Sequence, residues 1–179
     1  YADAPIVILM HWAGGDLCDW KDMARWMQNR LDENPAKLER CEAETRPASW
    51  WDPTWFPAMN PDVSIAVFAF DFRDFGESEK SGSWSDFKLD AAAAFKTVAG
   101  FEAVDAARMA SIGASIGADG APDGCLLYNQ EAGSGCVGAL SLSPGNYLGM
   151  NYAETVTGLA PNPTWCLAAE QDGESAPTC

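Results

Sequence analysis

Ser115 stands in the sequence pattern that most favours nucleophilic chemistry in this chain. An apolar run over residues 109–112 leads into Gly113-Ala-Ser115-Ile-Gly117. This pattern is typical of a sharp turn between a strand and a helix, because the two glycines remove Cβ groups that would clash where the backbone doubles back. We therefore predict a nucleophile elbow with the Ser115 hydroxyl at its apex. The same pentapeptide also occurs in ordinary turns, so the neighbouring segments must supply the context.

A serine nucleophile needs a base beside it, and His11 is the single histidine of the sequence. It follows an apolar run close to the other end of the chain. A half-buried histidine is more often a hydrogen-bonded structural group than a base, so we expect its ring to bond to loop backbone. A base for Ser115 would then have to come from outside these 179 residues.

Two further segments typical of buried strands precede the Ser115 motif. Residues 5–15 (PIVILMHWAGG) run into a glycine turn, and residues 63–78 (VSIAVFAFDFRDFGES) run into a polar loop. In this order the segments resemble the α/β-hydrolase superfamily, in particular its serine esterases and dienelactone hydrolases. The resemblance extends from about Pro5 to Asp172, which is nearly the whole chain.

The resemblance implies an α/β fold. It is a three-layer sandwich around a mainly parallel five-stranded sheet. We expect the strands near residues 6–11, 64–71, 108–113, 137–143 and 165–170. Their expected spatial order is second, first, third, fourth, fifth, which places the Ser115 turn at the carboxyl edge of the sheet.

The resemblance also implies roles for residues at that edge. Asp172 follows the last expected strand, where this superfamily carries the acid that orients the catalytic histidine. The backbone N–H groups of Ala13 and Ile116 are the expected oxyanion donors.

The chain departs from the superfamily pattern in several places. Trp12 follows His11 where a glycine is usual, and Asp74 replaces the usual glycine after the arginine. The sequence begins near the third strand of the standard fold and ends seven residues after Asp172, before the usual histidine. We interpret residues 1–179 as one domain, the central portion of a hydrolase domain. The remainder is cut away, outside the given sequence, supplied by another polypeptide or lost in evolution, and these alternatives stay open.

Six cysteines occur without a Cys-x-x-Cys pattern. Together with the single histidine, this disfavours a zinc site, and we expect neither metal nor cofactor. Order along the chain suggests disulfides between neighbours, namely Cys18 with Cys41, Cys125 with Cys136, and Cys166 with Cys179. The last would hold the loop that bears Asp172. Free thiols in a cytosolic enzyme are the alternative, but we favour disulfides and an extracellular or cell-surface setting.

The charge of the chain limits its partners. A net charge of −15 and a pI near 4.2 argue against nucleic acid, because no basic stripe is present to neutralise phosphates. No apolar stretch approaches the ~20 residues needed to cross a bilayer. The expected partner is a small-molecule or acyl substrate.

Residues 31–62 form an insertion too long for a simple link between helix and strand. Residues 46–61 contain three tryptophans and four prolines. One interpretation is an aromatic wall that binds an acyl group or a sugar. The other is an irregular loop that packs on the core or forms an oligomer contact, and the sequence favours this second one.

Helical spacing predicts helices over residues 19–30, 85–98 and about 152–157, the second with Ser83 or Ser85 as its cap. After the Ser115 turn, Pro122 and the glycines of residues 119–124 disfavour a continuous helix. We expect that helix to be interrupted there and to restart near Cys125.

Two functions follow from these observations. The first is a secreted serine hydrolase that cleaves an ester or related acyl bond through Ser115, with its histidine supplied from outside this segment. The second is a catalytically inactive extracellular protein that uses a hydrolase scaffold for binding or assembly, because a fold alone does not fix function.

Overall fold

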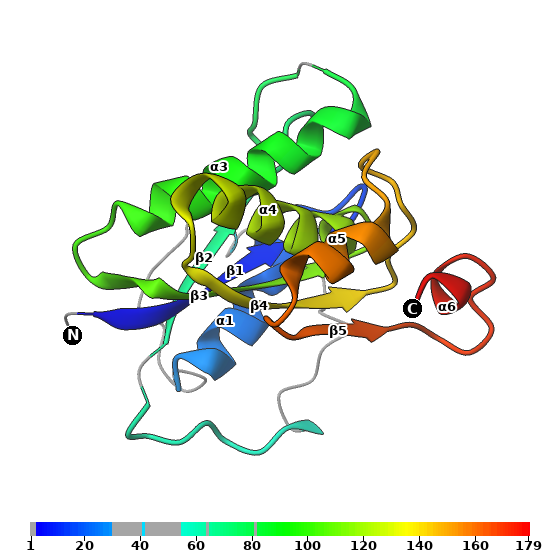
Figure 1. The fold of residues 1–179 in the computed structure, drawn as a ribbon. Helices are drawn as coiled ribbons and strands as arrows, with labels where there is room; N and C mark the ends of the chain where they lie inside the picture. The colour runs from blue at the N-terminus through cyan, green and yellow to red at the C-terminus, as the bar shows by residue number, and fades with distance from the viewer. Residues whose placement is uncertain (1–2, 30–40, 42–54, 64, 81) are drawn as a thin grey trace.

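Five parallel strands form one sheet in the computed structural model, which describes residues 3–29, 41, 55–63, 65–80 and 82–179 (Figure 1). The strands are β1 (Ala4–Met10), β2 (Ala66–Phe70), β3 (Val104–Ala114), β4 (Cys136–Leu142) and β5 (Thr164–Leu167). Their spatial order is β2-β1-β3-β4-β5. The predicted fold class and strand order are therefore confirmed.

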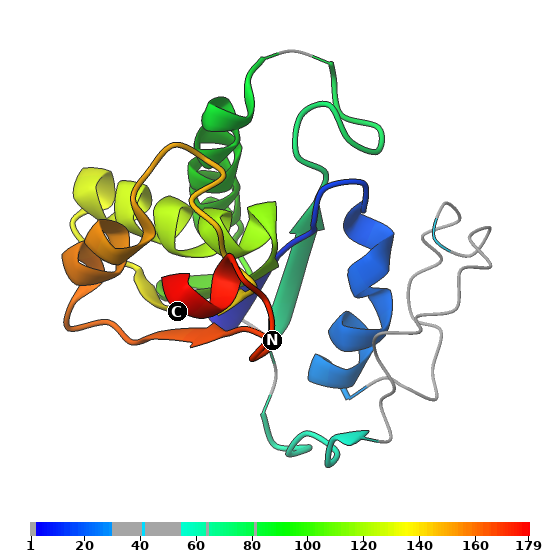
Figure 2. The same ribbon diagram turned by 90° about the vertical axis from the view of Figure 1, so that its right-hand side faces the viewer.

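Helices lie on both faces of the sheet. One face carries α3 (Phe87–Ala99), α4 (Ile116–Ala132) and α5 (Tyr152–Leu159), and the other carries α1 (Lys21–Met27), as Figures 1 and 2 show. The 3₁₀ turns η1 (Leu17–Trp20) and η3 (Trp84–Asp86) lead into α1 and α3, and the short α6 (Ser175–Thr178) follows β5. No helix within the described ranges is long and apolar enough to cross a membrane.

The apolar pattern of β1 explains why it lies at the centre of three layers. Ile6, Ile8 and Met10 are buried in the cluster that α3 and α4 complete, whereas Leu9 is buried with Trp20 on the side of α1. Successive side chains of a strand point to opposite faces, so both faces of β1 must be covered.

The α1 face is less well covered beyond β1. Val137, Trp165 and Leu167 keep 44%, 67% and 57% of their surface exposed. An apolar hollow of about 300 Å³ lies there, lined by Val137 and Trp165 together with Ala110 and Ile112. Parallel sheets usually have both faces covered, whereas here apolar side chains of β4 and β5 stay exposed on the α1 face.

Three disulfides join the cysteines that are neighbours along the chain, as predicted. They are Cys18–Cys41, Cys125–Cys136 and Cys166–Cys179. The first ties η1 to residue 41, the second links α4 to β4, and the third closes the loop that follows β5. Each disulfide restricts the unfolded chain and thereby stabilises the fold.

Most of the Trp/Pro-rich insertion, including Trp50 and Trp51, lies outside the described residues. Its last part is described from Trp55 onward. The Trp26 indole of α1 donates to the Pro57 carbonyl over 2.9 Å, and its ring lies 5.6 Å from that of Phe56. This part of the insertion therefore packs beside α1, while Trp55 remains 65% exposed.

The expected interruption of the helix after Ser115 is wrong, because α4 continues through Pro122 without a break. Proline lacks an N–H and leaves the carbonyl four residues earlier without its helical donor. In this protein the buried Ser141 hydroxyl of β4 donates to that carbonyl, Ala118 O, over 2.7 Å. A side chain from the sheet thus replaces the missing backbone donor, which local propensity does not reveal.

Replacing Ser141 with alanine should lower the free energy of unfolding by about 1–3 kcal/mol, because a buried carbonyl loses its donor. Ser111→Ala is the matched control. Its hydroxyl is equally buried and donates to Ala121 O of the same helix, which also accepts a helical N–H. Urea unfolding of both variants measures the difference. An equal loss in the two variants would contradict this account.

Asp123 is a buried acid on α4, with 2% of its surface exposed. Its carboxyl group accepts a hydrogen bond from the Thr155 hydroxyl of α5 over 2.9 Å. Burial raises its pKa to about 7, and the nearby charge of Asp119 adds to this effect. The folded state therefore favours the protonated form of Asp123.

The raised pKa predicts a pH-dependent stability. The folded state binds the Asp123 proton more tightly than the unfolded state, so this contribution to stability is complete below about pH 4 and is lost as pH rises to about 7. The loss is on the order of 3 kcal/mol. Asp123→Asn keeps an oxygen for Thr155 without a titrating proton, so denaturant unfolding at pH 4 and pH 7 should differ less than in the wild type. An unchanged difference would disprove the assignment.

Candidate active site

Ser115 lies between β3 and α4 in a backbone conformation that serine rarely adopts. Its φ is 53° and its ψ is −116°, and it is the N-cap of α4. Its N–H donates to Leu142 O at the end of β4 over 2.9 Å, and Ser115 O accepts from Ala118 N over 2.8 Å. Such strained residues persist only where the surroundings fix them, and they cluster at functional sites.

The two glycines of the motif are required by close backbone contacts. A Cβ on Gly113 would overlap the Gly117 carbonyl, and a Cβ on Gly117 would overlap the Met10 carbonyl of β1. Gly113 pairs directly with Met10 in the sheet. The turn at Ser115 is therefore as tight as the sequence motif predicted, and it is held against the end of β1.

His11 is buried and uses both ring nitrogens for backbone hydrogen bonds. Nε2 accepts from the Phe72 N–H over 3.0 Å, so the ring proton is on Nδ1, which donates to Trp12 O over 2.7 Å. Burial lowers the pKa of the ring, which favours the neutral form. The predicted structural role of His11 is confirmed, because its ring joins the loops that follow β1 and β2.

The expected oxyanion donors stand at the ends of adjacent strands. Ala13 lies in the turn after β1, which the hydrogen bond from Gly15 N to Trp12 O closes over 3.0 Å. Ile116 is the first residue of α4. The N–H group at the first position of a helix has no acceptor within that helix, so the N–H of Ile116 can bind an anion.

Asp172 lies in the loop between β5 and α6, at the same edge of the sheet. Its Oδ1 accepts from Ser175 N over 2.9 Å and from Glu174 N over 3.1 Å. These bonds, with smaller contributions from the Ser175 and Ser143 hydroxyls, lower its pKa. Asp172 is therefore a well-anchored carboxylate.

Ser143 connects the surroundings of the two candidate residues. Its hydroxyl interacts with Asp172, and its neighbour Leu142 accepts the N–H of Ser115. The end of β4 thus lies between the Ser115 turn and the loop of Asp172. Among the described residues, no group of three or more His, Cys, Asp or Glu side chains is placed to hold a metal ion.

Sequence reasoning missed three residues that shape this edge. Asp71 accepts from Leu17 N over 2.8 Å and from Glu77 N over 3.0 Å, so it braces the loops after β1 and β2. Asp119 and Tyr147 organise the loop after β4. A carboxylate directly after a buried strand is a signal that could have identified Asp71, but nothing in the sequence marks Asp119 as a partner of a distant loop.

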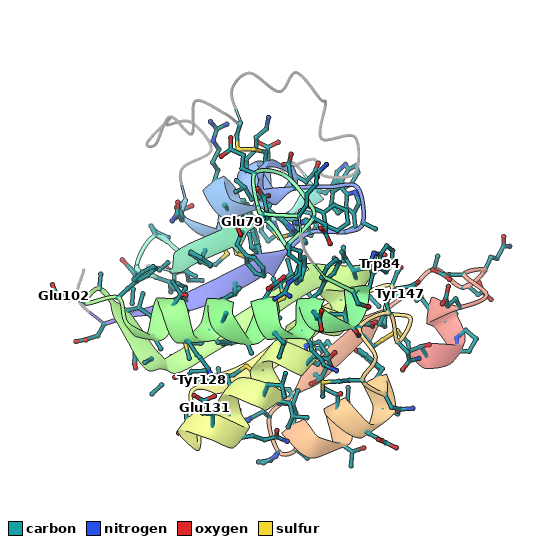
Figure 3. The ribbon with its side chains drawn as sticks, turned by 90° about the horizontal axis from the view of Figure 1, so that it is seen from above. Glu79, Trp84, Glu102, Tyr128, Glu131 and Tyr147 are labelled. Carbon is teal, nitrogen blue, oxygen red and sulfur yellow. A yellow bond between two sulfur atoms is a disulfide. The ribbon has the colours of Figure 1, made fainter. Side chains whose placement is uncertain are left out.

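Aromatic side chains also lie at this end of the molecule. Figure 3 shows Trp84 and Tyr147 at the end where the strands finish and α6 lies. Trp84 is 47% exposed and stacks on Phe87, with ring centroids 6.2 Å apart.

Solved structures share the fold of this chain. An esterase of the hyperthermophilic archaeon Pyrobaculum calidifontis matches 80% of this chain and 36% of its own, with a TM-score of 0.51 and 17% identity. EstE1, a thermostable carboxylesterase from a metagenomic library, matches 80% of this chain and 39% of its own, with a TM-score of 0.50 and 20% identity. This chain has the α/β-hydrolase fold.

The chain spans less than half the length of these two esterases. No protein-family model matches the sequence, and no curated protein is similar to it. The likeness to α/β-hydrolases is therefore seen in the three-dimensional structure, and it concerns the fold and not the activity.

Gly117→Ala tests the packing of the turn. The added methyl group meets the Met10 backbone, which no side-chain rotation can relieve, so unfolding should become easier by about 2 kcal/mol or more. Gly173→Ala is the control, because its Cβ would meet nothing within 4 Å. Thermal and urea unfolding give both values. Equal stability of the two variants would show that the turn accommodates a Cβ atom at residue 117.

Proposed function

We propose that this protein is a serine hydrolase that cleaves an ester or related acyl bond, with Ser115 as its nucleophile. The observation that carries the proposal is the strained backbone of Ser115, with φ at 53°, at the apex of a turn whose glycines admit no side chain. Such a turn holds a serine hydroxyl clear of the sheet and next to a helix N-terminus. The esterases that share the fold support the same reaction class.

In this proposal the Ser115 hydroxyl attacks the substrate carbonyl carbon while its proton passes to a histidine. The N–H groups of Ala13 and Ile116 hold the oxyanion of the tetrahedral intermediate. Collapse of the intermediate breaks the acyl bond, and the histidine returns the proton to the departing alcohol. Water then attacks the acyl-enzyme in the same manner, which releases the acid and restores Ser115.

The histidine of this mechanism comes from outside the 179 residues, because both nitrogens of His11 are bonded to backbone. Asp172 orients that histidine, and its loop is closed by the Cys166–Cys179 disulfide. Loss of the base lowers turnover about a millionfold in a serine protease, so the segment alone should be nearly inert. The three disulfides support secretion as part of the proposal.

A fluorophosphonate probe tests the proposed nucleophile. Intact-mass analysis of the full-length protein should show one adduct, which peptide mapping assigns to Ser115. Ser115→Ala should abolish the adduct, because the phosphorus atom is captured by an activated serine oxygen. Ser134→Ala, a change at an exposed serine outside the site, should leave it unchanged.

The absence of an adduct from the folded, full-length protein would refute the enzyme proposal. The binding or assembly role of a hydrolase scaffold would then be the better account, since the fold supports both.

A further inference from the structure

Asp119 is a buried carboxylate one helical turn after Ser115, with 3% of its surface exposed. Its Oδ1 accepts from Gly145 N over 3.0 Å, and its Oδ2 accepts from Tyr147 N. Burial raises its pKa, while these bonds and the N–H groups of Asn146 and Leu148 act in the opposite direction. One side chain on α4 thus accepts hydrogen bonds from the backbone of the loop that follows β4.

A carboxylate is suited to this task. Its two oxygens offer about four acceptor positions, whereas an asparagine has one accepting oxygen and an amide that would face the N–H groups. Burying a carboxyl group is costly unless its oxygens are bonded, and here both oxygens accept backbone N–H groups. The result is a loop whose backbone is fixed relative to the helix of the candidate nucleophile.

Tyr147 belongs to this fixed loop and lies on the side of the candidate acid, Asp172. Burial raises the pKa of the Tyr147 hydroxyl, and the neighbouring Glu174 carboxylate adds to this effect while Ser175 acts in the opposite direction. Ser175 and Glu174 in turn donate their N–H groups to Asp172 Oδ1. Figure 3 shows Tyr147 at the end of the molecule where α6 lies. Tyr147 is thus held by Asp119 at its backbone, and its hydroxyl lies near the two residues that donate to Asp172.

We infer that Asp119 is a positioning residue, which seats Tyr147 against the 172–175 loop and so fixes Asp172 relative to Ser115. The inference rests on the proposed hydrolase function, because it gives Asp172 a place beside the nucleophile. The disulfide Cys166–Cys179 joins the ends of the Asp172 segment, and the Tyr147 contact supports its interior. Catalytic groups misplaced by about 1 Å lose much of their effect, so holding the Asp172 carboxylate in place would preserve turnover.

Two variants test the inference in the full-length protein. Asp119→Asn weakens the hydrogen bonds from the backbone of the loop to residue 119. Tyr147→Phe removes the hydroxyl that lies near Glu174 and Ser175, and it leaves the buried Asp119 carboxylate intact. Asp123→Asn is the matched control, since Asp123 is an equally buried acid on α4 that bonds to Thr155 and not to the loop. Tyr147→Phe keeps the inference testable if Asp119→Asn does not fold.

The first readouts concern Asp172 itself. Hydrogen exchange of the Glu174 and Ser175 amides should become about tenfold faster in both test variants, as expected for the loss of one hydrogen bond. Carbon-detected NMR titration should show the pKa of Asp172 rising toward its ordinary value, because those amides hold it low. The control should change neither quantity. Unchanged exchange and an unchanged Asp172 titration in both test variants would overturn the inference.

Turnover of a short-chain aryl ester separates this inference from the proposed function. If both hold, the test variants lose kcat with little change in KM, and Ser115→Ala abolishes turnover. If the wild type has no Ser115-dependent turnover but the exchange and titration still respond, the hydrolase proposal fails and the contact pathway stands. Ser115-dependent turnover with kcat unaffected by either test variant would refute the positioning role.

Discussion

Close backbone packing at the turn between β3 and α4 is the constraint on which the rest of the structure depends. Gly117 lies against the Met10 carbonyl, and Gly113 lies against Gly117, so the first turn of α4 touches the end of β1 without intervening side chains. This contact fixes the positive φ of Ser115 and directs the N-terminus of α4 toward the edge of the sheet. The ends of β1, β3 and β4 lie at the same edge, because these strands are parallel neighbours in the sheet.

Polar contacts to buried α4 secure that packing. Serine hydroxyls of β3 and β4 donate to its carbonyls, Asp123 accepts from Thr155 of α5, and Asp119 accepts from the backbone of the next loop. Each buried polar group on this helix that could destabilise the core therefore has a partner. These contacts fix the positions of the helix, the neighbouring strands and the loop after β4 relative to Ser115.

The candidate site residues lie at one edge of the sheet, and the single histidine of the sequence has a different role there. A strained serine and a helix N-terminus follow β3, and an anchored carboxylate follows β5 on the far side of β4. The ring of His11 instead hydrogen-bonds to the loops after β1 and β2. The described residues thus include the proposed nucleophile, oxyanion donors and acid, and the proposal takes the base from outside them.

The sequence by itself determined the order of the elements and the turn at Ser115, because these depend on local patterns. Order along the chain suggested the pairing of the cysteines, and the structure decided it. Alternating and continuous apolar runs mark the strands, and a glycine on each side of a serine marks a backbone that must turn sharply. Tertiary structure alone decided that α4 continues through Pro122 and that Asp119 holds residues 145–148. In both cases the deciding hydrogen bond joins residues more than 20 positions apart, from Ser141 to Ala118 and from Gly145 to Asp119, and no local propensity encodes such a partner.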